Sequence, residues 1–440
     1  RLRGEDGSKV FSSVVIVTDR LSLDRNIKGT VKQLSDVSGQ VVCIGREADG
    51  SIAKGGSKSA QLARAVAERR EIVVVTIQTF LWAWSDIAAA GGLDGASFAV
   101  VIDEAHSSQD GENASALRRA LTMASDGERR RAAMPDVEGM TDEEALNEYF
   151  RAVQNAPAAA DNVSFFAFTA TPKAETKTLF GTPTGKVDDA GNAVMGSFHL
   201  YPMRQAYEEG YILNPLDGYV PYRTVATIED ANASDELVDE RAARRKIARW
   251  KSLHPTNVMS KVEIVIEHFV KNVAMLLDGQ AKAMIVTDSR PSVVRYKYAF
   301  DAYVRAHPEL DASKVSRALQ FKVPGEPLVA FSDKVPGWKC VVDEDEYLED
   351  SPFALIDREC EYTEAGMNPR GIGSVEAAFE RPERRFLIVA NKFQTGFDQK
   401  KLVALYIDKP LGNDIEIVQT YSRVNRTYPG KDRVFVVDFV

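Results

Sequence analysis

The stretch that most constrains this chain is the run from Phe98 to His106, FAVVIDEAH. Its first five residues are apolar, and a short apolar run before charged residues is typical of a strand buried in a parallel sheet. Asp103 and Glu104 follow at the C-terminal end of that strand, where α/β sheets bind ligands. Phosphoryl transfer needs charge neutralisation and a positioned nucleophile. If this edge is a phosphoryl-transfer site, Asp103 would hold a Mg²⁺ ion that bridges nucleotide phosphates, and Glu104 would orient or polarise the attacking water. A bare Asp-Glu pair can also merely solvate a strand end, so the rest of the chain must decide.

The composition excludes several other classes of protein. Hydrophobic residues make up 44% of the 440 residues and charged residues 27%, as in ordinary globular chains. No apolar run approaches the roughly 20 residues of a membrane span, and we expect no signal peptide at the start. Cys43, Cys340 and Cys360 are too few and too scattered for a disulfide framework or a zinc site, which favours the cytoplasm. The net charge of −9 means that any nucleic acid must be bound by local basic and polar groups.

Strand-like and helix-like segments alternate along the chain, which predicts an α/β fold with parallel sheets. We expect two tandem domains, 1–213 and 214–440, with a helical insertion at about 124–160 and a loop at 181–200. The expected strands lie at 14–17, 72–76, 98–102, 164–168, 283–286, 328–331, 386–390, 403–407 and 434–437.

A second motif, QTYSRVNR, occupies residues 419–426. The spacing Q-x-x-[G/S]-R-x-x-R predicts Arg423 and Arg426 on one face of a helix. Two guanidiniums so placed can reach a γ-phosphate as arginine fingers, each worth roughly 10³ to 10⁵ in rate. Surface arginines on helices are common, so it is the pairing with the 98–106 run that favours catalysis. Gln419 and His106 are candidate nucleotide contacts in the two motifs.

Further polar residues follow other strands. In NKFQTGFD, residues 391–398, Gly396 permits close backbone approach, and Asp398 can bind ribose or orient an arginine finger. Lys392, Thr395 and Gly396 suit phosphate contacts. Hydroxyls, amides and basic groups at strand ends can hold a nucleic-acid backbone without reading its sequence. For that role we predict Thr18, Arg20, Gln78, Thr79, Thr169, Thr171, Ser289, Arg290, Lys392 and Thr395.

Taken together, these motifs resemble the motor (R, HsdR-type) subunit of type I restriction–modification enzymes, with a superfamily 2 helicase-like core. The matching segments are 17–24, 101–109, 168–173, 203–210, 390–399 and 418–427. The resemblance implies two RecA-like domains that use ATP and Mg²⁺ to pump double-stranded DNA in a bacterial or archaeal cytoplasm. It also implies methyltransferase (M) and specificity (S) subunits as partners, and a nuclease domain N-terminal to the motor.

One element of that family pattern is absent. The phosphate loop G-x-x-x-x-G-K-[S/T] does not occur: Lys186 is followed by Val187, Lys431 by Asp432, and GGSKS at 55–59 has the wrong order. In the family the loop lies just upstream of the segment that opens this sequence. A first domain without its phosphate-loop strand is expected to have an unpaired slot beside the central strand. We therefore expect this sequence to be an internal piece of a longer chain.

Two alternatives remain open. One is another superfamily 2 DNA motor, such as a type III restriction subunit or a repair helicase, which stimulation by the M and S subunits would distinguish. The other is an ATPase-inactive DNA-binding fragment, which the missing phosphate loop favours. The retained Asp103, Glu104, Arg423 and Arg426 argue against the second, because a scaffold has no use for that set.

Overall fold

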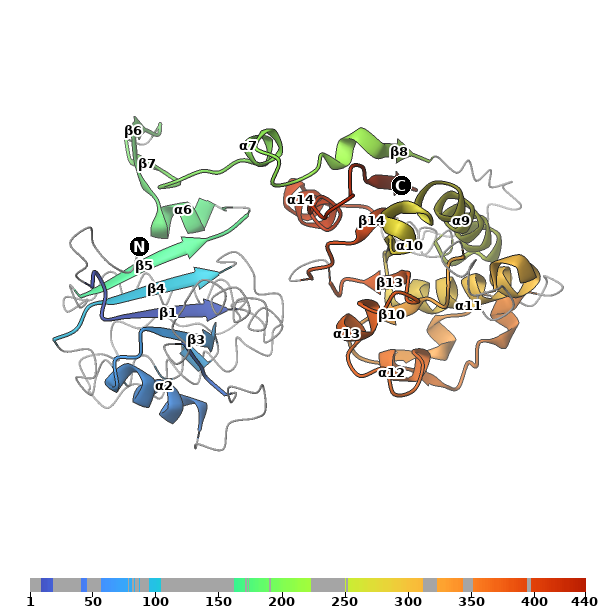
Figure 1. Cartoon of the computed structure of the whole chain (residues 1–440), viewed down its shortest axis with the longest axis horizontal. Helices are drawn as coiled ribbons and strands as arrows, with labels where there is room; N and C mark the ends of the chain where they lie inside the picture. The colour runs from blue at the N-terminus through green and yellow to red at the C-terminus, as the bar shows by residue number, and fades with distance from the viewer. Residues whose placement is uncertain are drawn as a thin grey trace, which may run out of the picture. The chain divides into compact units, whose positions relative to one another are not determined.

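The computed structural model divides the chain into two compact units, Arg1–Leu200 and Tyr201–Val440 (Figure 1). The described residues are 9–18, 41–45, 57–77, 79–80, 83, 87, 95–103, 162–170, 172, 174–189, 191–222, 250, 252–311, 323–342, 351–393 and 397–440.

Unit 1 is built on a five-stranded parallel sheet with the order β2-β3-β1-β4-β5. Its β-branched runs form strands because both faces of the inner strands are covered. The alternation predicted from the sequence is confirmed for the described residues. The elements are β1 (Ser13–Thr18), β2 (Val41–Cys43), α2 (Lys58–Ala67), β3 (Ile72–Thr76), β4 (Phe98–Asp103), β5 (Val163–Phe168), α6 (Ala174–Phe180), β6 (Thr182–Val187) and β7 (Ala193–Gly196).

The central strand β4 is paired on both sides, with β1 and with β5. The expected empty slot beside the central strand is therefore wrong. Among the described residues the edge strands of this sheet are β2 and β5, and in β5 intermediate and exposed side chains alternate. Phe166 and Phe168 are 43% and 60% exposed there, whereas Phe98 and Val100 of β4 are fully buried against β1 and α2.

The segment 181–200, expected to be a loop, contains the antiparallel hairpin β6–β7. Every residue of β6 is exposed, so backbone pairing alone defines it and no apolar alternation marks it in the sequence. The helical insertion predicted at about 124–160 lies outside the described residues.

Unit 2 is a second α/β unit, with a six-stranded parallel sheet in the order β10-β13-β9-β14-β15-β8 and a small antiparallel pair β11–β12. The α/β class with parallel sheets is confirmed. The elements are α7 (Met203–Glu208), η2 (Pro215–Gly218), β8 (Tyr219–Pro221), α9 (Pro255–His268), η3 (Phe269–Val273), α10 (Leu276–Gly279), β9 (Lys282–Thr287), α11 (Arg290–Ala306), η4 (Pro308–Leu310), β10 (Leu328–Ala330), β11 (Val335–Pro336), η6 (Gly337–Lys339), η8 (Pro352–Leu355), β12 (Glu361–Tyr362), α12 (Glu364–Met367), α13 (Val375–Phe379), β13 (Phe386–Ala390), β14 (Leu402–Asp408), α14 (Asp414–Tyr421) and β15 (Phe435–Asp438).

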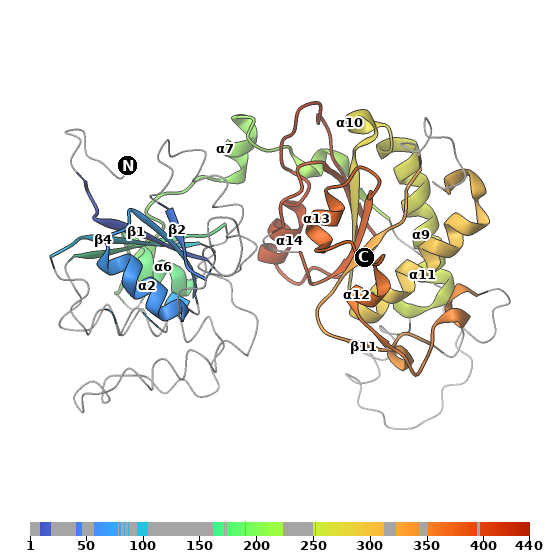
Figure 2. The same ribbon diagram turned by 60° about the horizontal axis from the view of Figure 1, so that its bottom comes forward.

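The two faces of this sheet bury separate apolar clusters. Along β13, Phe386 and Ile388 face the cluster that includes α9 and α11, and Leu387 and Val389 face the cluster that includes α13. This is the two-residue alternation of a strand. Figure 2 shows α9 and α11 on one side of the sheet and α13 on the other. Because both faces are covered, the strands are continuous apolar runs, which is why the sequence predicted them well.

The division between the units falls earlier than the expected boundary near Asn214. Residues 201–213 belong with unit 2 because the backbone joins them there. Ile212 forms an isolated antiparallel bridge with Arg426, and the Leu213 N–H donates to the Asn425 carbonyl at 2.6 Å.

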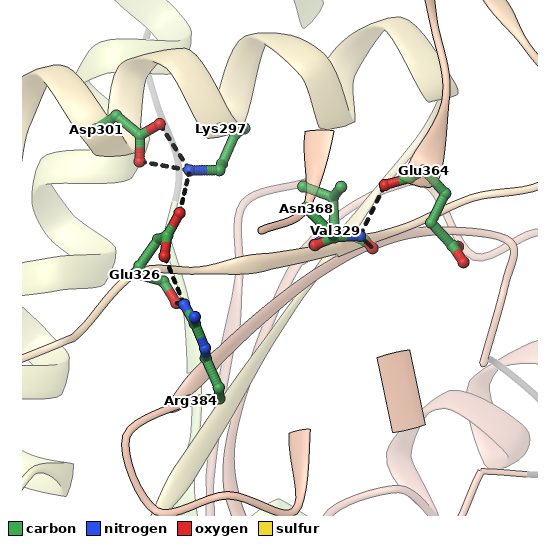
Figure 3. Close-up of polar contacts among 7 residues, drawn as sticks. All are labelled: Lys297, Asp301, Glu326, Val329, Glu364, Asn368 and Arg384. Carbon is green, nitrogen blue, oxygen red and sulfur yellow. Dashed lines mark hydrogen bonds and ion pairs between the residues drawn. The ribbon is translucent and has the colours of Figure 1, made fainter. Parts of the chain in front are cut away.

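The edge strand β10 is capped by side chains. The Asn368 carboxamide accepts from the Val329 N–H at 2.9 Å and donates to the Val329 carbonyl at 2.8 Å, as a neighbouring strand would (Figure 3). Glu364 accepts from the Phe331 N–H at 3.0 Å. These contacts satisfy edge groups that would otherwise invite pairing with another chain. No helix in the described part of the chain is long and apolar enough to cross a membrane.

Candidate functional site

In unit 1, the strand register brings polar side chains to one edge of the sheet. Val17 lies opposite Ile102, so Thr18 and Asp103 come next on the neighbouring strands β1 and β4. Asp103 lies opposite Phe168, and Thr169 follows. The prediction that Thr18, Asp103 and Thr169 each lie at a strand end is confirmed. That their strands are neighbours and bring them to one edge is shown by the register, and their chemical roles remain predictions.

Thr18 has a further feature. Its side chain is 1% exposed, and among the described residues its Oγ1 has no hydrogen-bond partner. A hydroxyl and a carboxylate are hard oxygen donors of the kind that Mg²⁺ prefers. Thr18, which the sequence analysis assigned to a nucleic-acid backbone, therefore fits a magnesium-bound phosphate beside Asp103 instead. Thr79 is committed locally, because its hydroxyl bonds that of Thr76 at 3.1 Å.

Several candidate residues lie outside the described part of the chain, and their roles stay predictions. They are Arg20, Gln78, Glu104, His106, Thr171, Thr395 and Gly396.

In unit 2, the prediction that Arg423 and Arg426 share one helix face is wrong. Helix α14 ends at Tyr421, with Ser422 as its C-cap. Arg426 lies in the bridge to Ile212, so tertiary pairing ends the helix before the arginines.

The two arginines also differ in their surroundings. Arg423 is 8% exposed and donates to the Phe397 carbonyl at 2.8 Å and to the Gln419 carbonyl at 3.2 Å. It therefore ties the segment before Asp398 to the end of α14. The Arg426 guanidinium pairs with the Asp398 carboxylate, and its side chain is 31% exposed. Of the two, Arg426 is the one that solvent and ligands can reach.

Lys431, which the sequence analysis excluded from a phosphate loop because Asp432 follows it, is a buried residue of the same unit. Pro429 and Gly430 form a tight turn in which Gly430 has φ +78° and the Lys431 N–H donates to the Tyr428 carbonyl at 2.9 Å. These features are those of a type II turn. The turn directs Lys431 back into the protein, where it is 7% exposed. The Pro-Gly pair is the sequence signal that could have predicted this turn.

The segment after β13 has a strained backbone. Asn391 and Phe393 have φ of +57° and +65°, a region that a bulky residue such as Phe393 seldom adopts and that often marks functional sites. Between them, the Lys392 ammonium bonds both oxygens of Glu364, at 2.8 and 2.7 Å. Figure 3 shows Glu364 beside the capped edge strand. Lys392, predicted to contact phosphate, is thus held by a carboxylate.

The remaining pair of candidates begins α11. Ser289 is the N-cap of that helix, and its hydroxyl also bonds Ser292 at 2.8 Å. Arg290 is 43% exposed and contacts Asp333 at 3.2 Å and the Ser332 carbonyl at 3.1 Å. Ser289 therefore has a structural role, while Arg290 is available at the surface.

Two family models match parts of this chain. The SWI2/SNF2 ATPase model matches residues 7–126, and the model of type I restriction enzyme subunit R domain 3 matches residues 374–439. The first range includes Asp103. The second includes Asp398, Arg426 and Lys431.

Two curated relatives come from Methanocaldococcus jannaschii and are assigned as endonuclease subunits of type I restriction enzymes. The MjaIXP subunit is 26% identical over 322 residues, covering 68% of this chain and 25% of the relative. The MjaVIIP subunit is 24% identical over 208 residues, covering 45% and 17%. The chain thus spans about a quarter or less of the length of these relatives.

Similar solved structures include a fragment assigned as an HsdR subunit of a type I restriction enzyme from Vibrio vulnificus. Its TM-score is 0.44 and its identity 15%, over 99% of this chain and 54% of that chain. The Hef helicase domain of Pyrococcus furiosus has a TM-score of 0.43 and 10% identity, over 98% and 87%.

The family and relative matches confirm the resemblance predicted from the motifs. Residues 7–126 are similar to SWI2/SNF2 ATPases. More particularly, residues 374–439 are similar to domain 3 of type I restriction enzyme R subunits, and the curated relatives are assigned as endonuclease subunits of such enzymes.

Proposed function

We propose that this chain is the ATP-dependent, double-stranded DNA translocase core of a type I restriction endonuclease R subunit. In this proposal it hydrolyses ATP to pump DNA before a nuclease domain outside these residues cleaves it. M and S subunits are its proposed partners, and the cytoplasm its proposed location.

The observation that carries the proposal is the Arg426–Asp398 pair, within the residues that match R subunit domain 3. The Arg426 guanidinium is partly exposed, and the Asp398 carboxylate holds it in one place. Because the neighbouring side chains of Arg423 and Lys431 are buried, this arrangement is pre-organised. The guanidinium can therefore meet the negative charge that develops on a transferred phosphoryl group without first losing rotamer freedom.

The proposed roles of the other residues follow from their chemistry. Bound Mg²⁺ would neutralise phosphate charge, and Asp103 and Thr18 would hold it at the edge of the unit 1 sheet. Glu104 would orient the attacking water and accept its proton. Arg426 would stabilise the γ-phosphate, while Asp398 keeps the guanidinium in place until nucleotide binds.

The test replaces Arg426 with Ala in the native polypeptide that contains this sequence. Duplex-stimulated ATP turnover is expected to fall by roughly 10³ to 10⁵, because an arginine finger of this kind is worth that much, while DNA binding remains. Arg433→Ala is the matched control, since Arg433 is an exposed arginine paired with its neighbour Asp432. Unchanged turnover in Arg426→Ala would contradict the finger assignment.

A second candidate function is DNA binding without ATP hydrolysis, favoured by the missing phosphate-loop sequence. It predicts duplex binding that neither ATP nor Arg426→Ala alters. Gel-shift titrations with and without ATP distinguish it from the motor, whose affinity for DNA should depend on the nucleotide.

A further inference from the structure

Lys431 is a buried ammonium whose contacts are all with backbone carbonyls of the candidate site. Its Nζ donates to Val424 O at 2.8 Å, Arg426 O at 2.8 Å and Lys400 O at 3.1 Å. An ammonium has three N–H donors and no acceptor, so three carbonyls match its capacity.

These carbonyls come from two segments that are distant in sequence. Val424 and Arg426 belong to the last three residues of the arginine motif 419–426. Lys400 lies two residues after Asp398. Lys431 therefore joins the segment that carries the guanidinium to the segment that carries its carboxylate partner. Arg423 makes a parallel connection through the Phe397 carbonyl.

We propose that Lys431 is a positioning residue, whose ammonium fixes the Arg426–Asp398 pair where the phosphoryl group reacts. This inference rests on the proposed ATPase function. Lys431 touches neither nucleotide nor DNA in this proposal; it acts through the backbone of Arg426 and of the segment after Asp398.

The alternative is that Lys431 is merely one more buried lysine that supports the fold. The chain offers a matched control for that reading. Lys282 is 1% exposed, and its Nζ donates to the Arg381 and Arg384 carbonyls at 2.9 and 2.8 Å. Its ammonium shares the burial and the bonding of the Lys431 ammonium but contacts neither of the two segments. The Lys282 backbone N–H donates to the Lys401 carbonyl at 2.9 Å, a bond that a side-chain substitution leaves in place.

The experiment compares Lys431→Met with Lys282→Met in the native polypeptide that contains this sequence. Methionine keeps the length and apolar stem of lysine and removes the donors. Lys431→Met is expected to lower kcat for duplex-stimulated ATP hydrolysis by about 10²-fold, the cost of a small misplacement of a catalytic group. The KM for ATP should change little, because the contact acts in the transition state. Lys282→Met should leave both constants near those of the wild type. Equal kcat values in the two variants would overturn the proposal.

A second measurement does not depend on ATP turnover. Amide hydrogen exchange is expected to quicken at 397–400 and 423–428 in Lys431→Met but not in Lys282→Met. Lys431→Gln should be intermediate, because its amide keeps two donors. Unchanged protection in those two segments would also overturn the proposal. A wild type that does not hydrolyse ATP would instead overturn the proposed function, and the exchange result would still decide whether Lys431 orders the two segments.

Discussion

Lys431 and Lys282 are both buried lysines whose ammonium groups donate to backbone carbonyls. Such contacts provide hydrogen bonds for the ammonium and for the carbonyls together. The difference lies in what each lysine holds. Lys282 closes the turn between α13 and β13, whereas Lys431 holds the segments of Asp398 and Arg426. The same kind of contact therefore supports the fold at Lys282 and, in our proposal, orders a catalytic site at Lys431.

The electrostatic surroundings of the two lysines also differ. Burial lowers the pKa of Lys282 to about 8, and the nearby Glu380 carboxylate partly opposes the change. Burial lowers the pKa of Lys431 to about 7, and there the neighbouring Arg426 charge acts in the same direction. The ammonium form, whose three donors match the three carbonyls, therefore predominates below about pH 7. Bringing the guanidinium close to a second cation raises the energy of the site, and the Asp398 carboxylate offsets this by pairing with Arg426.

The largest expected difference in kcat comes from removing the carboxylate charge near one lysine or near the other. Asp398→Asn should lower kcat for duplex-stimulated ATP hydrolysis by about 10²-fold, because Arg426 loses its orienting charge. Glu383→Gln, which also removes a carboxylate charge near Lys282, should leave kcat unchanged. Steady-state turnover of the two variants checks this, and a similar loss in both would remove the distinction between the two regions.

The next prediction concerns the energetic coupling between Lys431 and Asp398. If Lys431 and Asp398 both act through Arg426, the double variant Lys431→Met/Asp398→Asn should lose much less than the product of the single losses. Residues in one network show interaction energies of about 0.5–3 kcal/mol, whereas independent sites add. Lys282→Met should add nothing to the kcat loss of Asp398→Asn. Multiplicative losses for Lys431 and Asp398 would place them in separate networks.

Unfolding stability should respond to both lysines alike. Each Lys→Met variant leaves carbonyls without a donor, which costs about 1–3 kcal/mol of unfolding free energy per buried group. Urea midpoints should therefore fall to a similar extent in Lys431→Met and Lys282→Met. A much larger fall for Lys431→Met would mean that lost turnover reports unfolding, so the exchange measurement would have to carry the argument.

The pH dependence of stability distinguishes the two lysines. A lysine with a folded pKa below its ordinary value of 10.5 binds fewer protons when folded than when unfolded, so its contribution to stability increases as pH rises through that interval. For Lys431 the interval begins at about pH 7 and for Lys282 at about pH 8. Between pH 7 and 8, Lys431→Met should flatten the rise in urea midpoint more than Lys282→Met. The reverse order would contradict these pKa directions.

The smallest effect extends the comparison to a third lysine. Lys392 pairs with a carboxylate rather than carbonyls and is 29% exposed, so its pair should contribute little to stability. If Lys392 contacts a DNA phosphate, Lys392→Met should reduce the salt slope of DNA binding by about 1. Glu364→Gln, which weakens the competing pair, should tighten binding a few-fold. Lys334→Met removes the exposed Lys334–Glu361 pair and should change neither quantity.

The sequence predicted most strands of the two parallel sheets because they are apolar runs, but it missed the three-residue edge strands β2 and β8. It also predicted that Thr18, Asp103 and Thr169 each lie at a strand end, whereas the order β1-β4-β5, which makes their strands neighbours, comes only from the fold. The hairpin at 182–196 was missed because its strands are largely exposed. The early end of α14 depends on the pairing of Ile212 with Arg426, which no local pattern reports. The contacts of Lys431 reach Lys400, 31 residues away, so only the folded chain reveals them.

The most direct test of the motor proposal is duplex-stimulated ATP hydrolysis by the native polypeptide containing this sequence, measured beside Glu104→Gln. That variant keeps the shape of the side chain and removes the charge that orients water. ATP turnover by the native polypeptide is expected to rise when duplex DNA is added. In Glu104→Gln this turnover should be lost while DNA binding is retained. Equal turnover in both proteins, or DNA binding by the wild type without any ATP hydrolysis, would contradict the motor proposal.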